Sequence, residues 1–339
     1  MERVYQPEHY VKLPEIPADD AERLKQLHSL QLLDTEPEER FDRLTRMGCR
    51  LFNVKTCVIS LVDEHRQWFK SRQGIDASET DRCVSFCGHA ILTGGIFEVQ
   101  DTLKDSRFFD NPLVIGEPFI RFYAGCSIRS GGYTMGTICI LDSQPRKLSD
   151  EDKLLLSDLA ASVESEMEAH QIAHTDELTG LINRRGFYMV AGQVVKLVRR
   201  EKHSLGISLL DLNDFKQIND KFGHIVGDRA LQAFASLIAK VFRESDVVAR
   251  IGGDEFVCLH SDIDEAGLEV AKKRLADEVN AFNQRTHEPF RLSYAHGTAL
   301  FSKEQITDSL DALLHAADSS MYTIKSQQRR QRQFSTGSE

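Results

Sequence analysis

The sequence lacks three features that mark common classes of protein. It has no excess of positive charge, since 52 acidic residues outnumber 42 Lys and Arg residues and give a net charge of −10. Polymeric DNA or RNA is therefore not an expected partner, because its binding depends on phosphate neutralisation by Lys and Arg. No apolar run approaches the roughly 18 residues of a membrane span, and residues 1–7 lead into no signal-peptide core. We therefore expect no membrane partner.

The cysteines do not suggest a disulfide framework. There are seven, an odd number, and they are scattered, most of them beside apolar residues. Free thiols pack in such places as small hydrophobic groups. The sequence thus favours a reducing, cytoplasmic location, where any sensed signal has to be cytosolic or membrane-permeant.

The chain has enough length and apolar content for about two domains. It holds 339 residues, of which 41% are hydrophobic, against a typical domain of roughly 150 residues. The pattern changes near residue 170. We expect an N-terminal arm (1–19), a sensor-sized α+β domain (20–150), a signalling helix or linker (151–174), a second domain (175–332) and a disordered tail (333–339).

The first domain begins with two helix-like segments, 21–33 and 38–52. Strand-like alternation follows at 56–62, 67–71, 96–99 and 135–141. A closing helix starts at the cap signal Ser149–Glu151. It carries a stripe at spacings of three and four, formed by Leu156, Leu159, Val163, Met167, His170 and His174. The first two turns fit a coiled-coil seam or docking on the same domain equally, and the glutamates beyond Val163 favour the seam.

The densest chemical signal is Arg250–Phe256, where two glycines precede two acids between apolar segments. The pattern predicts a hairpin whose Gly252–Gly253 pair takes positive φ, with Asp254 and Glu255 at its tip. Adjacent carboxylates repel each other unless a cation shares them. Mg²⁺ is the usual cation at such a hard oxygen site.

A second acid follows the apolar run 205–210, at Asp211. If that strand lies beside the hairpin, Asp211 and Asp254 converge on one metal. The alternative is that Asp211 caps the next helix, which we expect over 215–224 with Gly223 closing it. Gly227 and Asp228 then open a helix expected over 229–242.

Three motifs in order, 176–185, 211–228 and 250–256, resemble the GGDEF family of diguanylate cyclases over about residues 172–332. The resemblance implies an antiparallel-centred α+β domain similar to polymerase palms and nucleotidyl cyclases. It also implies a reaction that joins two GTP molecules into cyclic di-GMP and releases two pyrophosphates. The arrangement of two GTP molecules around a symmetric product implies a homodimer.

The resemblance also implies roles for individual residues. Asp211, Asp254 and the backbone carbonyl of Leu212 match ligands for two Mg²⁺ ions, with Mn²⁺ as a substitute. Asp254 matches a proposed proton acceptor as well, and the adjacent Glu255 is a second catalytic acid. The sequence does not separate metal ligation from proton transfer at Asp254.

Asn219 and Asp228 match the pair of residues that reads guanine in the family. A carboxylate suits this role because it can accept hydrogen bonds from both donors on the guanine edge. Two cations match phosphate contacts, Lys325 and Arg329, although the usual Gly-Arg-Asn ending is replaced here by Gln-Arg-Arg. Other residues of the same motif are substrate candidates, with helix-surface or core roles as the alternative: Phe215, Lys216 and His224.

An Arg-x-x-Asp pair, Arg243 and Asp246, precedes the hairpin at the family's spacing for a product-binding inhibitory site. Arg274 matches a further contact. Arginine can grip phosphate or stack on guanine, and aspartate can accept from it. The alternative is a surface ion pair of little energetic weight.

The N-terminal half is similar to the GAF sensor family over about residues 20–168, through motifs at 33–42, 66–71, 85–91, 121–125 and 136–139. This implies a PAS-like antiparallel sheet with flanking helices, and it leaves the small-molecule ligand open. Cys87 and His89 are residue types that haem, bilin or redox sensors use. The sequence favours the alternative, in which Cys87 is a packed thiol and His89 a hydrogen-bonded core histidine.

Two functions follow. The first is a GAF-regulated diguanylate cyclase with feedback inhibition. The alternative is a catalytically silent GGDEF receptor for GTP or cyclic di-GMP. A phosphodiesterase role has no support in the sequence, which shows no further domain after residue 332.

Overall fold

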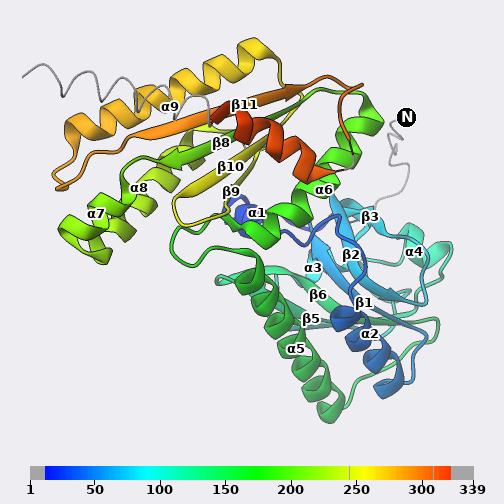
Figure 1. Cartoon of the computed structure of the whole chain (residues 1–339). Coiled ribbons are helices and arrows are strands. Elements are labelled where there is room, and N and C mark those ends of the chain that lie inside the picture. The colour runs from blue at the N-terminus through cyan, green and yellow to red at the C-terminus, as the bar shows by residue number, and fades with distance from the viewer. Residues whose placement is uncertain (1–11, 244, 308, 322–339) are drawn as a thin grey trace, which may run out of the picture. The chain divides into compact units, whose positions relative to one another are not determined.

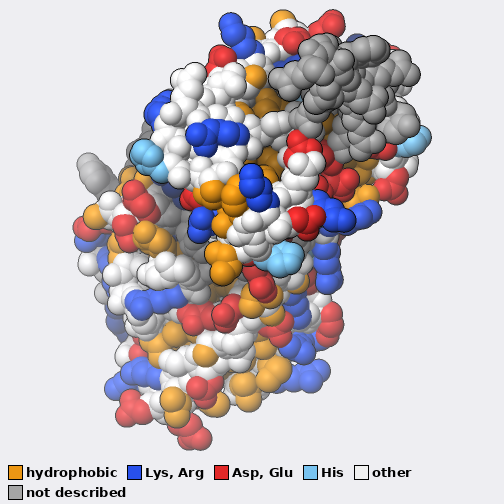
Figure 2. Space-filling view, turned by 60° about the vertical axis from the view of Figure 1, so that its left-hand side comes forward, with side chains coloured by type: hydrophobic (Ala, Val, Ile, Leu, Met, Phe, Trp, Pro, Cys, Tyr) orange, Lys and Arg blue, Asp and Glu red, His pale blue; other side chains and the backbone are white. Residues whose placement is uncertain are grey.

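The computed structural model describes residues 12–243, 245–307 and 309–321, and the chain divides into two compact units between Gln171 and Ile172 (Figure 1). Each unit combines a sheet with helices, so the predicted α+β class is confirmed. Within the described ranges, the helices all lack an apolar stretch that could cross a membrane. On the face shown in Figure 2, Lys and Arg side chains are interspersed with Asp and Glu and form no single basic patch.

The N-terminal unit is built on a six-stranded antiparallel sheet in the order β3-β2-β1-β6-β5-β4. The strands are β1 (Thr56–Val62), β2 (Arg66–Gln73), β3 (Glu79–Asp81), β4 (Ile96–Val99), β5 (Phe122–Ser130) and β6 (Tyr133–Asp142). The strands expected at 56–62 and 96–99 are confirmed. β5 was missed because Phe122–Ile128 is buried throughout and shows no alternation of polar and apolar residues.

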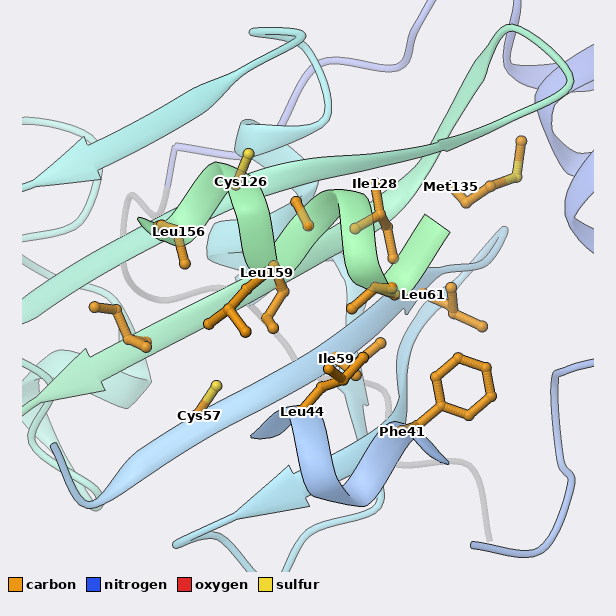
Figure 3. Close-up of a cluster of buried hydrophobic side chains, with 14 of the residues drawn as sticks. Phe41, Leu44, Cys57, Ile59, Leu61, Cys126, Ile128, Met135, Leu156 and Leu159 are labelled. Atoms are coloured by element: carbon orange, nitrogen blue, oxygen red, sulfur yellow. The ribbon is translucent and has the colours of Figure 1, made fainter. Parts of the chain in front are cut away.

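Helices cover both faces of this sheet: α1 (Asp20–Ser29), α2 (Glu39–Leu51), α3 (Phe86–Ala90), α4 (Pro112–Ile115) and α5 (Asp150–His174), with a 3₁₀ turn η1 (Arg82–Val84). One hydrophobic cluster joins α1, α2 and α5 to the sheet through side chains such as Phe41, Ile59 and Leu159 (Figure 3). On the opposite face, Phe86, Phe108 and Val114 pack with Val58. Alternate residues of β1 therefore serve two separate cores.

The apolar stripe of α5 packs on its own unit. Leu156, Leu159, Val163 and Met167 are between 0% and 4% exposed and belong to the same cluster as α1 and α2. The docked alternative is thus confirmed as far as Met167. The coiled-coil seam expected beyond Val163 is wrong, because these side chains are already buried within the domain.

The C-terminal unit has a five-stranded sheet in the order β11-β8-β10-β9-β7, antiparallel except for β7 and β9. Its strands are β7 (Ile182–Asn183), β8 (Leu205–Leu212), β9 (Val247–Arg250), β10 (Glu255–Ser261) and β11 (Tyr294–Phe301). β8 is buried along its whole length and is flanked by two antiparallel neighbours. The antiparallel-centred arrangement implied by the sequence is confirmed.

Helices cover the two faces of this second sheet: α6 (Arg184–Glu201), α7 (Phe215–Phe222), α8 (His224–Val241) and α9 (Glu265–Arg285), with residues 310–321 also helical. α6 and residues 310–321 pack on one face, whereas α8 and α9 pack on the other. Gly223 closes α7 as predicted, with a φ of 84°. α8 begins at His224, five residues earlier than expected, because the chain turns directly from Gly223 into the next helix.

Candidate active site

The two predicted metal acids lie on adjoining strands. β8 and β10 pair so that Asp211 stands opposite Glu255, and the backbone N–H of Leu212 donates to the carbonyl of Asp254 over 3.0 Å. Asp211 is 9% exposed, Asp254 is half-buried and Glu255 is exposed. The strand and the hairpin therefore lie side by side as expected, with the acids grading in burial from the core to the surface, and convergence of Asp211 and Asp254 on one metal stays a prediction.

The turn that carries the acids differs from the expected one. Neither Gly252 nor Gly253 has a φ in the left-handed region, and Asp254 and Glu255 lie at the entry to β10 rather than at the tip. The prediction of positive φ is wrong because the connection is longer than a two-residue turn, with the Ile251 N–H donating to the Glu255 carbonyl over 3.0 Å. A Cβ at Gly252 would lie 2.5 Å from Glu255 Oε2, so a larger residue there would have to displace the end of that flexible side chain.

Arg250 braces this turn from outside the acid cluster. Its Nη2 and Nε donate to the carbonyl of Gly253 over 2.7 and 3.2 Å, and its Nη1 donates to both carboxylate oxygens of Asp176 over 3.0 and 3.1 Å. Burial alone would raise the pKa of Asp176, but the hydrogen bonds from Thr179 and Arg250 lower it overall. Sequence reasoning assigned no role to this pair, whose members are 74 positions apart.

The donor set at the strand ends fits a hard divalent cation. Asp211, Asp254 and Glu255 offer carboxylate oxygens and Leu212 offers a carbonyl oxygen, so every candidate ligand is oxygen. Mg²⁺ and Mn²⁺ prefer such ligands, whereas softer metals favour sulfur and nitrogen.

The predicted guanine-reading pair lies on two helices in close contact. Asn219 is on α7, and its Oδ1 lies 1.9 Å from where a Cβ of Gly227 would stand on α8, one residue before Asp228. Asn219 Oδ1 is buried with no hydrogen-bond partner among the described residues. Asp228 is exposed. The glycine thus allows α7 and α8 to approach and brings the two predicted residues near each other.

The remaining substrate candidates have mixed positions. Phe215 is half-buried and packs against Gly227, while Lys216 and His224 are exposed. Lys325 and Arg329 lie outside the described residues. A cavity of about 300 Å³ adjoins Glu255, between α6 and residues 310–321, and is lined in part by Tyr188 and Asp311. Tyr188 donates to Asp311 Oδ1 over 2.7 Å. Neither residue was singled out from the sequence, because neither one carries a pattern that marks a functional side chain.

The residues predicted for the inhibitory site do not form a surface ion pair. Arg243 and Arg274 are exposed, the latter on α9, but the side chain of Asp246 is only 6% exposed. Its Oδ2 accepts from the backbone N–H of Arg243 over 2.9 Å and lies 3.3 Å from His260 Nδ1. The carboxylate thus points into the domain.

The N-terminal unit holds a cavity of about 370 Å³, with apolar and polar walls that include Phe69, Phe86, Cys87, Tyr123 and Cys139. Cys87 Sγ lies 3.8 Å from Cys139 Sγ and accepts from Thr137 Oγ1 and Tyr123 Oη over 3.1 and 3.3 Å. His89 is buried, with Nε2 at 3.1 Å from the carbonyl of Lys12. Both side chains therefore have the packed, hydrogen-bonded roles that the sequence favours.

Comparison with known proteins gives two family matches. Residues 36–167 match the GAF domain, and residues 173–331 match the family described as diguanylate cyclase, GGDEF domain. Both resemblances noted in the sequence are thereby confirmed.

Among curated relatives from Pseudomonas aeruginosa, the cyclic di-GMP phosphodiesterase PA2567 is 38% identical over 174 residues, which cover 50% of this chain and 30% of the relative. The diguanylate cyclase TpbB is 35% identical over 202 residues, covering 57% of this chain and 41% of the relative. The diguanylate cyclase DgcP is 30% identical over 300 residues, covering 81% and 43%. The chain spans less than half the length of each of these relatives. Because the two family models match one after the other, the chain belongs to the GAF–GGDEF proteins, with a GAF domain followed by a GGDEF domain.

Proposed function

We propose that this protein is a diguanylate cyclase, which joins two molecules of GTP into cyclic di-GMP and releases two pyrophosphates. The observation that carries the proposal is the pairing of Asp211 with Glu255 across β8 and β10, directly beside Asp254. The names of the relatives TpbB and DgcP support the same reaction. Asp211, Asp254 and the Leu212 carbonyl are the proposed ligands of two Mg²⁺ ions.

Divalent cations at these oxygen atoms would neutralise the triphosphate and make the attacking 3′-hydroxyl more acidic. The chain contributes the rest of the chemistry. The carboxylate of Asp254 accepts the proton of the 3′-hydroxyl, and the adjacent Glu255 assists as the second acid. Arg250 holds the turn through the Gly253 carbonyl, so that the acids keep their position while the nucleotide binds.

Substrate choice is assigned to Asn219 and Asp228. The ring N–H and exocyclic amine of guanine are two donors that a carboxylate can accept together, and adenine lacks this pattern. Asn219 lies against Gly227, one residue before Asp228, which puts the two proposed guanine-reading residues on neighbouring helices. The flanking Phe215, Lys216 and His224 complete the proposed pocket, with Lys325 and Arg329 as the proposed phosphate contacts.

Regulation is proposed at two places. Two GTP molecules must meet around a two-fold axis to close a symmetric product, so the active form is a homodimer. Product binds at the exposed Arg243 and Arg274 and inhibits, while the buried carboxylate of Asp246 holds the backbone of Arg243 in place. The cavity of about 370 Å³ in the N-terminal domain is large enough for a small molecule and is the proposed sensor site. We assign the sensor to residues 20–150, the signalling helix to 151–174 and the cyclase to 175–332.

A catalytically silent receptor for GTP or cyclic di-GMP is the second candidate. One relative favours it: PA2567 matches half of this chain, yet its name gives a phosphodiesterase activity and not a cyclase activity. The intact set of Asp211, Asp254 and Glu255 favours the cyclase, because a receptor has no need of clustered acids next to a bound triphosphate.

The decisive experiment is incubation of the full chain with GTP and Mg²⁺, followed by chromatographic separation of the nucleotides. We expect cyclic di-GMP from the wild type, and none above the detection limit from Asp254→Ala. Asp277→Ala, at an exposed position on α9, is the matched control and should retain activity. Retained turnover in Asp254→Ala would refute the assignment, whereas bound but unconverted GTP in the wild type would favour the receptor.

A further inference from the structure

A second cluster of metal-ligating groups lies on the C-terminal sheet, apart from the acids at the start of β10. Asp246, Cys258 and His260 offer one oxygen, one sulfur and one nitrogen, and the three atoms all lie within 4.8 Å of one another. Cys258 and His260 are two positions apart on β10, so their side chains share a face. Asp246 immediately precedes β9, the partner strand of β10.

The spacing of the donor atoms suits a tetrahedral ion. His260 Nδ1 lies 3.3 Å from Asp246 Oδ2 and 3.6 Å from Cys258 Sγ. With Zn–N and Zn–O bonds near 2.0 Å and Zn–S near 2.3 Å, the edges of a tetrahedral zinc site are about 3.3 Å for N···O and about 3.5 Å for N···S. We propose that Asp246 Oδ2, Cys258 Sγ and His260 Nδ1 form a binding site for a zinc-class divalent ion.

The surroundings of His260 support this role. Its Nε2 lies 3.0 Å from Ser208 Oγ on β8. When Nδ1 binds a metal, Nε2 carries the proton and donates it to Ser208, which fixes the ring in the ligating orientation. Metal-binding histidines usually have such a partner on the second nitrogen. Asp246 is fixed in the same way by the N–H of Arg243.

Charge balance explains why such an ion is stable in a buried place. The side chains of Cys258 and His260 are fully buried, and Phe242 packs 5.1 Å from the His260 ring. Burial, and then the Asp246 carboxylate, raise the pKa of the Cys258 thiol well above its usual value. A bound divalent cation stabilises the thiolate instead, so its proton leaves to solvent on binding. One thiolate, one carboxylate and one neutral imidazole then neutralise the two positive charges.

The donor types also separate this site from the catalytic one. Sulfur and imidazole nitrogen select zinc-class ions over Mg²⁺, and three protein ligands leave a fourth position for water. A bound ion would tie Asp246 to β10. Because the site is defined by its ligands alone, it does not depend on the proposed cyclase activity.

The test is metal binding by the full chain. After treatment with a chelator, the wild type should bind Zn²⁺ in competition with a chromophoric chelator, and bound Co²⁺ should show a thiolate-to-cobalt charge-transfer band. That band should be lost in Cys258→Ser and His260→Gln. Ser208→Ala should weaken Zn²⁺ binding roughly 10- to 100-fold, the usual effect of removing a partner of a metal-bound histidine.

Two controls separate the site from non-specific effects. His296 is a buried histidine on β11, separated from β10 by β8, so His296→Gln should leave the band unchanged. Cys57→Ser removes a buried thiol in the other domain and should also leave it unchanged. A Co²⁺ spectrum of the wild type without a thiolate band would overturn the proposal, and so would a band that persists in correctly folded Cys258→Ser.

Discussion

One hairpin of the C-terminal domain carries two clusters of potential metal ligands, and they differ in donor type and in burial. Asp254 and Glu255 stand at the entry to β10 with Asp211 alongside, and all their donors are oxygen. Cys258 and His260 lie a few residues further along, and with Asp246 they offer sulfur, nitrogen and oxygen. The first cluster reaches the surface, whereas Cys258 and His260 are closed from solvent.

If both proposals hold, position along one strand separates two metal sites of different chemistry. A substrate with a triphosphate needs an accessible, hard cation, which the oxygen cluster suits. A buried site of sulfur, nitrogen and oxygen donors instead suits a zinc-class ion. Substitutions in the oxygen cluster should therefore leave Zn²⁺ binding intact, and substitutions of Cys258 or His260 should leave cyclic di-GMP formation intact.

The largest expected effect is that of Asp211→Asn. Replacing this carboxylate should reduce cyclic di-GMP formation to the detection limit, because a proposed metal ligand and one negative charge are lost. Zn²⁺ affinity, measured by competition with a chromophoric chelator, should stay at the wild-type value. Loss of both properties in a folded variant would break the separation between the two clusters.

Asp228→Ala should lower kcat/KM for GTP by roughly 10- to 100-fold, because hydrogen bonds to a charged group contribute about 1.5–3 kcal/mol. Steady-state kinetics with varied GTP provide the measurement. Lys273→Ala, at an exposed position on α9, is a control that should leave kcat/KM unchanged. An equal loss in both variants would remove Asp228 from the guanine pocket.

Gly252→Ala should lower kcat by about tenfold, because a Cβ would press on Glu255 Oε2 and displace that carboxylate. The neighbour is the end of a flexible side chain, so the melting temperature should change little. Gly253→Ala is a close control, since nothing lies within 4 Å of its Cβ position and its φ is not left-handed. If the two variants behave alike, the close contact of Gly252 has no catalytic importance.

Arg243→Ala should raise the cyclic di-GMP concentration needed for half-inhibition by about tenfold, the result of losing one charge-assisted contact. The initial rate without product should remain that of the wild type. Inhibition curves at several product concentrations test this. Unchanged sensitivity to product would leave Arg243 as an ordinary surface side chain.

The smallest effect concerns the Asp176–Arg250 pair that braces the turn. The pKa of Asp176 is lowered in the folded state, so its ionised carboxylate contributes stability at pH values above its unfolded pKa of about 3.9. That stability is lost as the pH falls through the folded-state pKa of Asp176. Asp176→Asn should therefore melt below the wild type near pH 7, and the two should converge in acid. A constant difference in melting temperature at all pH values would contradict this origin.

The sequence predicted those features that depend on local patterns. The apolar run before Asp211 and the two segments around Gly252 and Gly253 indicated adjacent strands, and β8 and β10 pair as this requires. Gly223 ended a helix because its left-handed φ is characteristic of glycine at that position. Such signals lie within a few residues of the structure they specify.

Other features depend on contacts between distant residues and could not be predicted. The stripe on α5 has the spacing of a coiled-coil seam, but the surface that covers it is set by the folding of α1, α2 and the sheet. The sequence indicated that Asp246 belongs to a product-binding site or, as the alternative, to a surface ion pair, and its closeness to His260 depends on the register of β9 and β10. Arg250 reaches Asp176 across 74 positions.

The central claim is that the oxygen cluster of the hairpin makes cyclic di-GMP from GTP. Its most direct test is the quantification of cyclic di-GMP and pyrophosphate after incubation of the wild-type chain with GTP and Mg²⁺. We expect both products, with two pyrophosphates for each cyclic di-GMP. GTP recovered unchanged from the folded, Mg²⁺-containing wild-type protein, at all protein concentrations that allow dimers to form, would contradict it.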